Sequence, residues 1–323
     1  MGRLTAMGEV RVLEPGFLTT IQDARGRPGF GRFGIPPGGA ADAAAARLAN
    51  RLVGNGGDEA VLEVTLQGPT LEWMTAGHIG LAGANLGATA GGLEMPPGHS
   101  YRLASGSRLE FRGPREGARG YLAVEGGFAV PAVLGSCGTD LRSGFGGFEG
   151  RALRVGDVVP FSVGQDGPLR SAVGGAAVAQ QVLSFIPCPP RFGWFAPSAV
   201  RAFCDVEWTV APDSDRLGIR LAGAAIPSMT TGIASFGVPV GAVQVPPGGA
   251  PIIKLADGPV TGGYPVLGVI PRAEHTRLAQ AAPGTTLRFA RASVTDVRRH
   301  ARRSEDGERI ELDDGDFAAG WAR

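Results

Sequence analysis

"GFLTTIQDARGRPGFGRFGIPPGGAAD", residues 16–42, is the stretch that decides between two fold classes for this chain. It contains a G-x-G-x-x-G spacing at Gly29, Gly31 and Gly34, which cradles a pyrophosphate when it follows a strand and opens a helix. Here the spacing runs into Ile35-Pro36-Pro37-Gly38-Gly39, and consecutive prolines remove backbone N–H donors where a phosphate loop needs them. The sequence therefore argues against a dinucleotide-binding fold and indicates a turn.

Short apolar runs dominate the rest of the chain. Runs such as "EVRVLEP", "RLEFRG", "RGYLAVEGG", "PIIKLAD" and "TLRFAR" alternate apolar and polar residues between Gly, Pro, Asp or Asn, as half-buried antiparallel strands do. Helical patterns are few and short: 42–54 with Asp42 as N-cap, 197–203, 272–284, and one from Ser293. We expect a mainly β protein with a few short helices.

The two halves of the sequence resemble each other. "GIPPGGAAD" has a counterpart in "VQVPPGGAP", and "PPGHSYRLASGSRLEF" (96–111) has one in "PGTTLRFARASV" (283–294). A repeated unit of short strands, with a join in the apolar-poor stretch 162–181, is consistent with two β-barrels, which leave few free strand edges. We predict domains over 9–170 and 180–295, followed by a tail over 296–323.

Composition excludes several classes of function. The 31 basic and 30 acidic residues give a net charge of +1, so no overall field points to nucleic acid or a membrane surface. The N-terminus has no apolar core of signal-peptide length, and no apolar run approaches a membrane span. Cys137, Cys188 and Cys204 form no C-x-x-C pair. We expect a cytoplasmic protein that binds neither nucleic acid nor membranes.

Common catalytic and metal motifs are absent. The sequence has no G-x-x-x-x-G-K-[ST], no G-x-S-x-G and no S-x-x-K. Its four histidines have neither H-x-x-x-H nor H-E-x-x-H spacing, so we expect no dedicated metal site. There is no Met-Lys-Met, so we expect no covalent biotin on this chain.

What remains is a set of polar residues in three loops that are otherwise built of glycine and proline. They are, loop by loop, Gln22, Asp23, Arg25, Arg27 and Asp42; Asp213, Ser214, Asp215, Arg216 and Arg220; and Gln244, Lys254, Asp257, Thr261 and Tyr264. Polar small-molecule pockets need such loops: an arginine grips a carboxylate, a glutamine pairs with an amide, and an aspartate orients or deprotonates an N–H group.

Purely structural interpretations compete with this one. The aspartates of "PDSDRLGIRL" are also the residues that bond their own backbone in turns. Asp23 and Arg25 are also suited to a loop-closing ion pair, and "TGGYP" to a type II turn. Lys254, the single lysine of the chain, lies within an apolar run.

At these three loops the chain resembles one family. Four segments carry the resemblance: "GFLTTIQDARGRPGFGRFGIPPGGAAD", "SDRLGIRLAG", "GAVQVPPGGAPIIKLADGPVTGGYPVLG" and residues 121–160. They are similar to the signature segments of the KipA / allophanate hydrolase subunit 2 family. This family includes the C component of 5-oxoprolinase and is also called biotin-dependent carboxyltransferase-like. The likeness runs from about Val10 to Ala292. It implies two cyclophilin-like β-barrel domains.

The resemblance also implies a function. Such a chain would be the C component (PxpC) of an ATP-dependent 5-oxoprolinase, with a KipI/PxpB-like partner and with ATP and Mg²⁺ in the complex; a PxpA-like third component is left open. One alternative is a carboxyltransferase half that moves CO2 from carboxybiotin to a urea-like substrate. Another is a non-catalytic KipA-like regulator that binds a KipI-like protein.

The family likeness assigns expected roles to the three loops. Asp215, Arg216 and Asp257 are expected to be catalytic, with Arg216 or Arg220 on the substrate carboxylate or a phosphate, and Asp215 or Asp257 on a proton or an N–H group. Gln22 or Gln244 is expected to bind the lactam amide. The other expected substrate-binding residues are Asp23, Arg25, Asp42, Lys254, Thr261 and Tyr264. Gly38, Phe236 and Gly258 depart from the family pattern and thin this polar lining.

Overall fold

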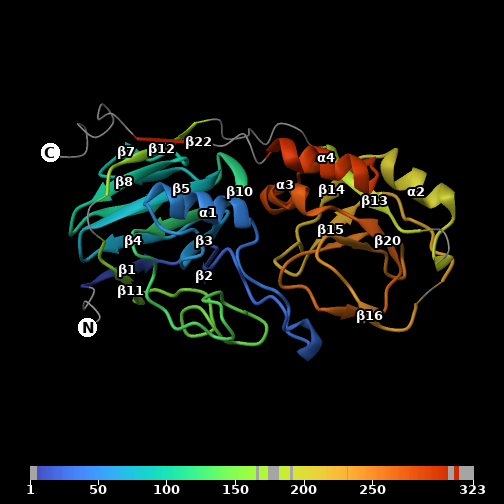
Figure 1. The fold of residues 1–323 in the computed structure, drawn as a ribbon, viewed down its shortest axis with the longest axis horizontal. Coiled ribbons are helices and arrows are strands. Elements are labelled where there is room, and N and C mark those ends of the chain that lie inside the picture. The colour runs from blue at the N-terminus through green and yellow to red at the C-terminus, as the bar shows by residue number, and fades with distance from the viewer. Residues whose placement is uncertain are drawn as a thin grey trace. The chain divides into compact units, whose positions relative to one another are not determined.

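The computed structural model describes residues 6–164, 167–173, 182–189, 192–230, 232–304 and 309–312. These residues form two compact, mainly β units (Figure 1). The first contains 6–27, 38–164, 167–173 and 309–312; the second contains 28–37, 182–189, 192–230 and 232–304. The expected fold class is confirmed. Among the described residues, every helix is too short or too polar to be a membrane span.

The first unit consists of two sheets and one helix. The first sheet has the order β11 (Val158–Ser162), β1 (Met7–Glu14), β4 (Thr70–Trp73), β9 (Arg108–Phe111), β6 (Ala88–Ala90) and β7 (Leu93–Glu94). The second sheet has the order β2 (Leu18–Gln22), β3 (Val61–Thr65), β10 (Glu116–Val124), β5 (Gly77–Asn85), β8 (His99–Leu103), β12 (Arg170–Val173) and β22 (Arg309–Leu312).

One apolar core holds these two sheets together. Alternation along β1 buries Val10 and Val12, and they pack with Leu62 of β3 and Ile79 of β5. Helix α1 (Ala43–Leu52) packs on the second sheet through a separate apolar cluster. A Cβ on Gly80 would lie 2.4 Å from the carbonyl oxygen of Ala49 in α1, so glycine is what lets the helix approach this sheet.

The second unit is built on a closed barrel. Its strands follow one another as β13 (Val182–Pro187), β20 (Val266–Val269), β17 (Ala242–Gln244), β18 (Ile252–Lys254), β15 (Gly218–Ala222), β14 (Trp208–Val210) and β21 (Thr286–Arg291). A separate two-stranded ribbon joins β16 (Phe236–Gly237) to β19 (Thr261–Gly262). This unit also contains the 3-10 helices η1 (Gly31–Phe33) and η3 (Arg272–Glu274) and the helices α2 (Pro197–Cys204), α3 (His275–Gln280) and α4 (Val294–Ser304).

Aromatic packing closes the barrel core. Phe203 of α2 stacks on Phe289 of β21 with ring centroids 4.5 Å apart, and it also contacts Phe185 and Trp208. All four side chains are fully buried. Because a buried aromatic side chain removes a large apolar area from water, this cluster fixes α2 against the barrel.

Local signals placed the helices well. Asp42 is the N-cap of α1, and its carboxylate accepts a hydrogen bond from the N–H of Ala45 (3.1 Å). Helix α3 lies within the predicted 272–284, α2 covers the predicted 197–203 and ends one residue later, and α4 starts at Val294, one residue after the predicted start. Helix α4 and strand β22 fall in the range that the sequence assigned mainly to a tail, and residues 305–308 and 313–323 of that range lie outside the described residues.

The G-x-G-x-x-G segment is a turn, as the prolines indicated. Gly29 and Gly34 have φ of 89° and 80°, in the left-handed region, and a 3-10 turn (Gly31–Phe33) lies between them. The segment Pro28–Pro37 groups with the second unit. A Cβ on Gly31 would lie 3.8 Å from a methyl carbon of Val260 in that unit.

Candidate functional site

Asp23 of the first loop joins two chain segments of the first unit. It is buried, and one carboxylate oxygen accepts a hydrogen bond from the Gly26 N–H (2.6 Å). The other oxygen accepts from the hydroxyl of Ser136 (2.7 Å) and the N–H of Cys137 (2.6 Å). A carboxylate with three donors is well satisfied, so Asp23 holds the 136–137 segment in place.

Gln22 lies next to Asp23, and only the nitrogen of its side-chain amide forms hydrogen bonds in the described structure. Its Nε2 donates to the Thr139 carbonyl (3.3 Å) and the Thr20 hydroxyl (3.1 Å), while its buried Oε1 accepts no hydrogen bond within the described structure. A Cβ on Gly138 would lie 2.8 Å from that oxygen. Since an unmatched buried acceptor is unfavourable, Gln22 remains a candidate for binding a donor.

The other charged residues of the first loop have separate roles. Asp42 caps α1, as described above. Arg27 is buried; it donates to the carbonyls of Val133 (3.2 Å) and Gly138, and lies over the ring of Phe145. Arg25 is exposed and forms no ion pair with a described residue. The suggested Asp23–Arg25 ion pair does not form.

The second loop is largely a self-contained turn. Asp215 is exposed, and its Oδ1 accepts hydrogen bonds from the N–H groups of Leu217 (2.8 Å) and Gly218 (3.2 Å). Arg220 pairs with Asp213 at 3.1 Å on the surface. Asp215 therefore adopts the backbone-bonding arrangement that the sequence left open as an alternative.

Arg216 and Asp257 form a buried bidentate ion pair. The Nε and Nη2 atoms of Arg216 lie 2.7 and 3.0 Å from the two carboxylate oxygens of Asp257. The backbone is joined as well, because the Asp257 N–H donates to the Arg216 carbonyl (3.2 Å). The geometry is that of a fork-to-fork pair, and it ties the second loop to the third.

Gln244, Lys254 and Arg220 share one face of the barrel wall. In the register, Gln244 of β17 and Arg220 of β15 both lie opposite Ile252 of β18, two residues before Lys254. Residues two apart on a strand point to the same face, and diagonal neighbours on paired strands lie within reach of long side chains. The intervening residues face the barrel core; Ile253 is one of them.

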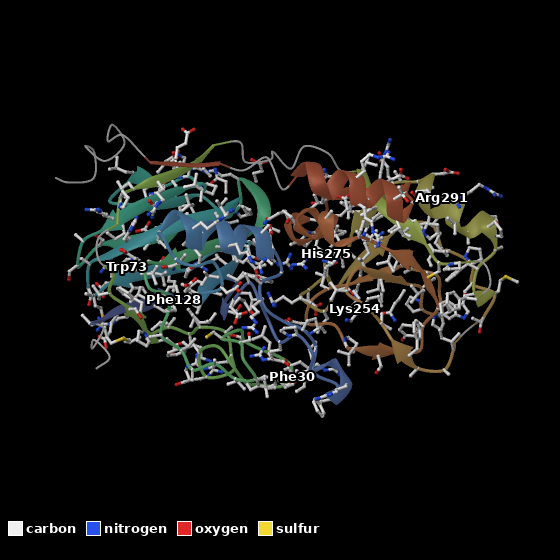
Figure 2. The ribbon with its side chains drawn as sticks, in the orientation of Figure 1. Phe30, Trp73, Phe128, Lys254, His275 and Arg291 are labelled. Carbon is white, nitrogen blue, oxygen red and sulfur yellow. The ribbon has the colours of Figure 1, made fainter. Side chains whose placement is uncertain are left out.

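Lys254 is a buried cation without a matching anion. The side chain lies among the strands of the second unit (Figure 2) and the residue is 3% exposed. No described carboxylate forms an ion pair with it. Burial lowers the pKa of its ammonium group below the ordinary 10.5, because a poorly solvated site disfavours the charged form.

Two glycines leave room for these side chains. A Cβ on Gly258 would lie 2.7 Å from Lys254 Cγ, and one on Gly262 would lie 2.7 Å from Gln244 Nε2. Gly262 belongs to the β16–β19 ribbon, so this ribbon lies against the amide of Gln244. Gly258, a departure from the family pattern, thus has a packing reason here.

The last two expected site residues lie in the β16–β19 ribbon and just after it. Thr261 lies in β19 opposite Gly237, and its side chain is exposed. Tyr264 follows the ribbon and is 43% exposed. The structure therefore groups Gln244 and Lys254 in the second unit and Gln22 and Asp23 in the first. A single pocket that includes all three loops stays a prediction.

Sequence reasoning missed the partners of these residues. Ser136 is buried, donates to Asp23 and accepts from the Gly138 N–H (2.9 Å). The run "LGSCGTD" that contains it was visible in the sequence, but no local pattern indicated a partner 113 residues away. Within the described chain, no group of three or more His, Cys, Asp or Glu side chains is arranged to hold a metal ion.

Comparison with known proteins identifies relatives along nearly the whole chain. The sequence model of the family described as "Carboxyltransferase domain, subdomain A and B" matches residues 33–291. The C component of the 5-oxoprolinase of Escherichia coli is 36% identical over 293 residues, which cover 89% of this chain and 93% of that protein.

Larger fungal proteins contain a similar segment. The urea amidolyase of Saccharomyces cerevisiae is 31% identical over 313 residues, covering 90% of this chain and 17% of that protein. The crystal structure of the K. lactis urea amidolyase matches with a TM-score of 0.84 at 29% identity, over 92% of this chain and 19% of that chain. The chain therefore spans less than a fifth of either fungal protein.

Proposed function

This chain belongs to the carboxyltransferase domain family, subdomains A and B, and we propose that it is the C component of an ATP-dependent 5-oxoprolinase, which converts 5-oxoproline to glutamate. In this proposal it acts with a KipI-like partner and a PxpA-like third component. The similarity to the Escherichia coli protein supports the proposal, because it covers almost the full length of both chains.

The observation that carries the proposal is the buried Lys254, whose ammonium forms no ion pair with a described carboxylate and which shares a barrel face with Gln244. 5-Oxoproline carries a carboxylate and a lactam amide. The substrate carboxylate would supply a negative counter-charge for the Lys254 ammonium. The primary amide of Gln244 can both donate a hydrogen bond to the lactam carbonyl and accept one from the lactam N–H.

The ion-pair geometry revises the expected roles of the arginines. Arg216 already has both carboxylate oxygens of Asp257 on its guanidinium, and Arg220 faces Asp213 at the surface. Removing Asp257 from Arg216 to admit a substrate would leave a buried charge unpaired, which is unfavourable. We therefore assign the substrate carboxylate to Lys254, with the Arg216–Asp257 pair supporting the loops around it.

The assembly has to supply the activation step. An amide is stabilised by resonance, and bound ATP would supply the energy for activating its carbonyl. The described residues offer no donor cluster for the Mg²⁺ that accompanies ATP, and we assign none of them to it. In this proposal, the role of this chain within the assembly is to bind and orient the lactam.

Reconstitution tests the proposal. The chain is co-purified with its KipI-like and PxpA-like partners, and glutamate formation from 5-oxoproline is measured with and without ATP. We expect ATP-dependent turnover. If the complete assembly shows no turnover, the 5-oxoprolinase function is refuted.

The carboxylate assignment has its own test. Lys254→Met should reduce kcat/KM for 5-oxoproline by roughly 10- to 100-fold, as expected for one hydrogen bond to a charged group, mainly through KM. Arg288→Met is the matched control, because its exposed guanidinium pairs with Glu207. On 2-pyrrolidinone, which lacks the carboxylate, wild type and Lys254→Met should react equally slowly. An unchanged KM in Lys254→Met would refute the assignment.

The fungal relatives favour a second candidate, half of a carboxyltransferase that uses carboxybiotin carried by another protein. The supporting observation is the match to two urea amidolyases over 90% or more of this chain. Transfer of labelled carboxylate from a biotinylated carrier to urea, by this chain in complex with its KipI-like partner, tests it. If the complex forms but acts on neither substrate, a KipA-like regulatory role becomes the better proposal.

A further inference from the structure

A cavity of about 320 Å³ lies in the second unit, beside helix α2. It is lined by the end of β13 and the chain that follows it, by α2, by β20 and by the last residue of β21. Gln244 and Lys254 are not among its lining residues. Its volume is at the lower end of the range for small-molecule sites.

Aromatic rings form one wall of this cavity. Phe192 and Trp194 stack with centroids 4.7 Å apart and planes 15° from parallel. Trp194 also packs against Phe236 of β16, with ring centroids 5.5 Å apart. Phe192 is 46% exposed. A flat, partly exposed aromatic surface favours stacking with another planar ring.

Unmatched positive charge lies at the same cavity. Arg201 of α2 and Arg291 at the end of β21 both line it and are exposed, and neither forms an ion pair with a described acid. Asp205, the C-cap of α2, is the one acidic residue among the lining residues described. Figure 2 shows Arg291 on the α2 side of this unit. The net charge of these three groups is +1, which suits a monoanion better than a polyanion.

We propose that this cavity binds a small planar aromatic carboxylate, with its ring against Phe192 and Trp194 and its carboxylate directed to Arg291 and Arg201. The apolar wall supplies affinity for the ring and the arginines supply selectivity for the anion. The site is separate from the residues proposed above for 5-oxoproline, so either proposal can fail without the other.

The cysteines provide a direct test. Cys188 and Cys204 line the cavity, whereas Cys137 belongs to the first unit and serves as an internal control. The full chain is treated with N-ethylmaleimide at pH 8.5, since burial raises the pKa of all three thiols. Alkylation of each thiol is followed by mass spectrometry with 2-naphthoate or with its neutral analogue 2-naphthylmethanol.

We expect 2-naphthoate to slow alkylation of Cys188 and Cys204 by about tenfold at ten times its Kd, because about a tenth of the sites are then empty, and to leave Cys137 unchanged. Arg291→Gln and Arg201→Gln should weaken protection by naphthoate but not by naphthylmethanol. Arg288→Gln, outside the cavity, should have no effect.

Three results would overturn the proposal. The first is no protection of either cavity thiol. The second is equal protection by both compounds with no effect of the arginine variants, which means adventitious apolar binding only. The third is full protection by the KipI-like partner in the absence of ligand, which would assign the cavity to a protein interface.

Discussion

Replacing Asp257 by Asn tests whether the Arg216–Asp257 pair is a structural support of the second unit. The change keeps the size and shape of the side chain but leaves the buried Arg216 without its counter-charge. A matched control lies in the same region: Asp213→Asn removes the partner of Arg220. The side chains of Arg216 and Asp257 are 4% and 8% exposed, whereas those of Arg220 and Asp213 are 52% and 71% exposed.

The difference in exposure sets the expected magnitudes. Removing one partner of a buried ion pair leaves an uncompensated charge and lowers the free energy of unfolding by about 3–5 kcal/mol. Removing one partner of an exposed pair changes it by about 0–1 kcal/mol, because water solvates the remaining charge. At about 1.4 kcal/mol per factor of ten, Asp257→Asn should increase opening of the barrel by about 10²-fold to about 4 × 10³-fold.

Hydrogen exchange of the amides in β15 and β18 measures this opening, with β5 and β10 of the first unit as reference strands. We expect faster exchange in β15 and β18 for Asp257→Asn and no change for Asp213→Asn. The double variant Arg216→Met/Asp257→Leu should recover most of the protection, because an apolar pair of similar volume can replace a buried ion pair. Equal effects of the two Asn variants would refute the reasoning.

The structure predicts how substitutions at three further positions change the stability of the protein. Lys254→Met should raise the melting temperature at pH 7. This increase in melting temperature should become smaller toward pH 10.5. The pKa of Lys254 is lower in the folded than in the unfolded protein, so the wild type becomes more stable as the pH rises from the first value to the second. An increase that calorimetry finds to be independent of pH would contradict this. Gly258→Ala puts a Cβ 2.6 Å from the carbonyl oxygen of Leu217 and should destabilise by roughly 1–3 kcal/mol in urea unfolding, whereas Gly237→Ala, with open space around it, should be close to neutral. Asp42→Ala should lose about 1 kcal/mol of helix capping while Asp42→Asn keeps most of it; equal losses in urea unfolding would show that the cap is not the cause.

Features that depend on neighbouring residues were predictable from the sequence. Asp42 before an apolar-striped run indicated the N-cap of α1, and the structure has it there. The double proline after Gly34 indicated a turn instead of a phosphate loop, and Gly34 adopts a left-handed conformation beside a single 3-10 turn. Strand alternation indicated the mainly β class. Each of these signals arises within a few residues of the backbone.

The pairing of charges was decided by the tertiary structure alone. From the sequence, Asp23, Arg216 and Asp257 all looked equally available for a substrate. Folding brings Ser136 to Asp23 across 113 residues and Asp257 to Arg216 across 41, and both carboxylates are used there in holding loops together. Nothing in a local pattern specifies such partners, because they meet only when separate strands pair.

Lys254 shows the same division. The sequence predicted a strand at "PIIKLAD", with the single lysine of the chain inside it. The structure has Lys254 in β18, next to the core residue Ile253 and on the other face of the strand. Only the tertiary structure decided that this face is covered, with Gly258 over the lysine stem and the β16–β19 ribbon against Gln244. Segments that are distant in the sequence cover the lysine side chain and exclude water from it. Its burial is therefore set by the fold and cannot be predicted from neighbouring residues.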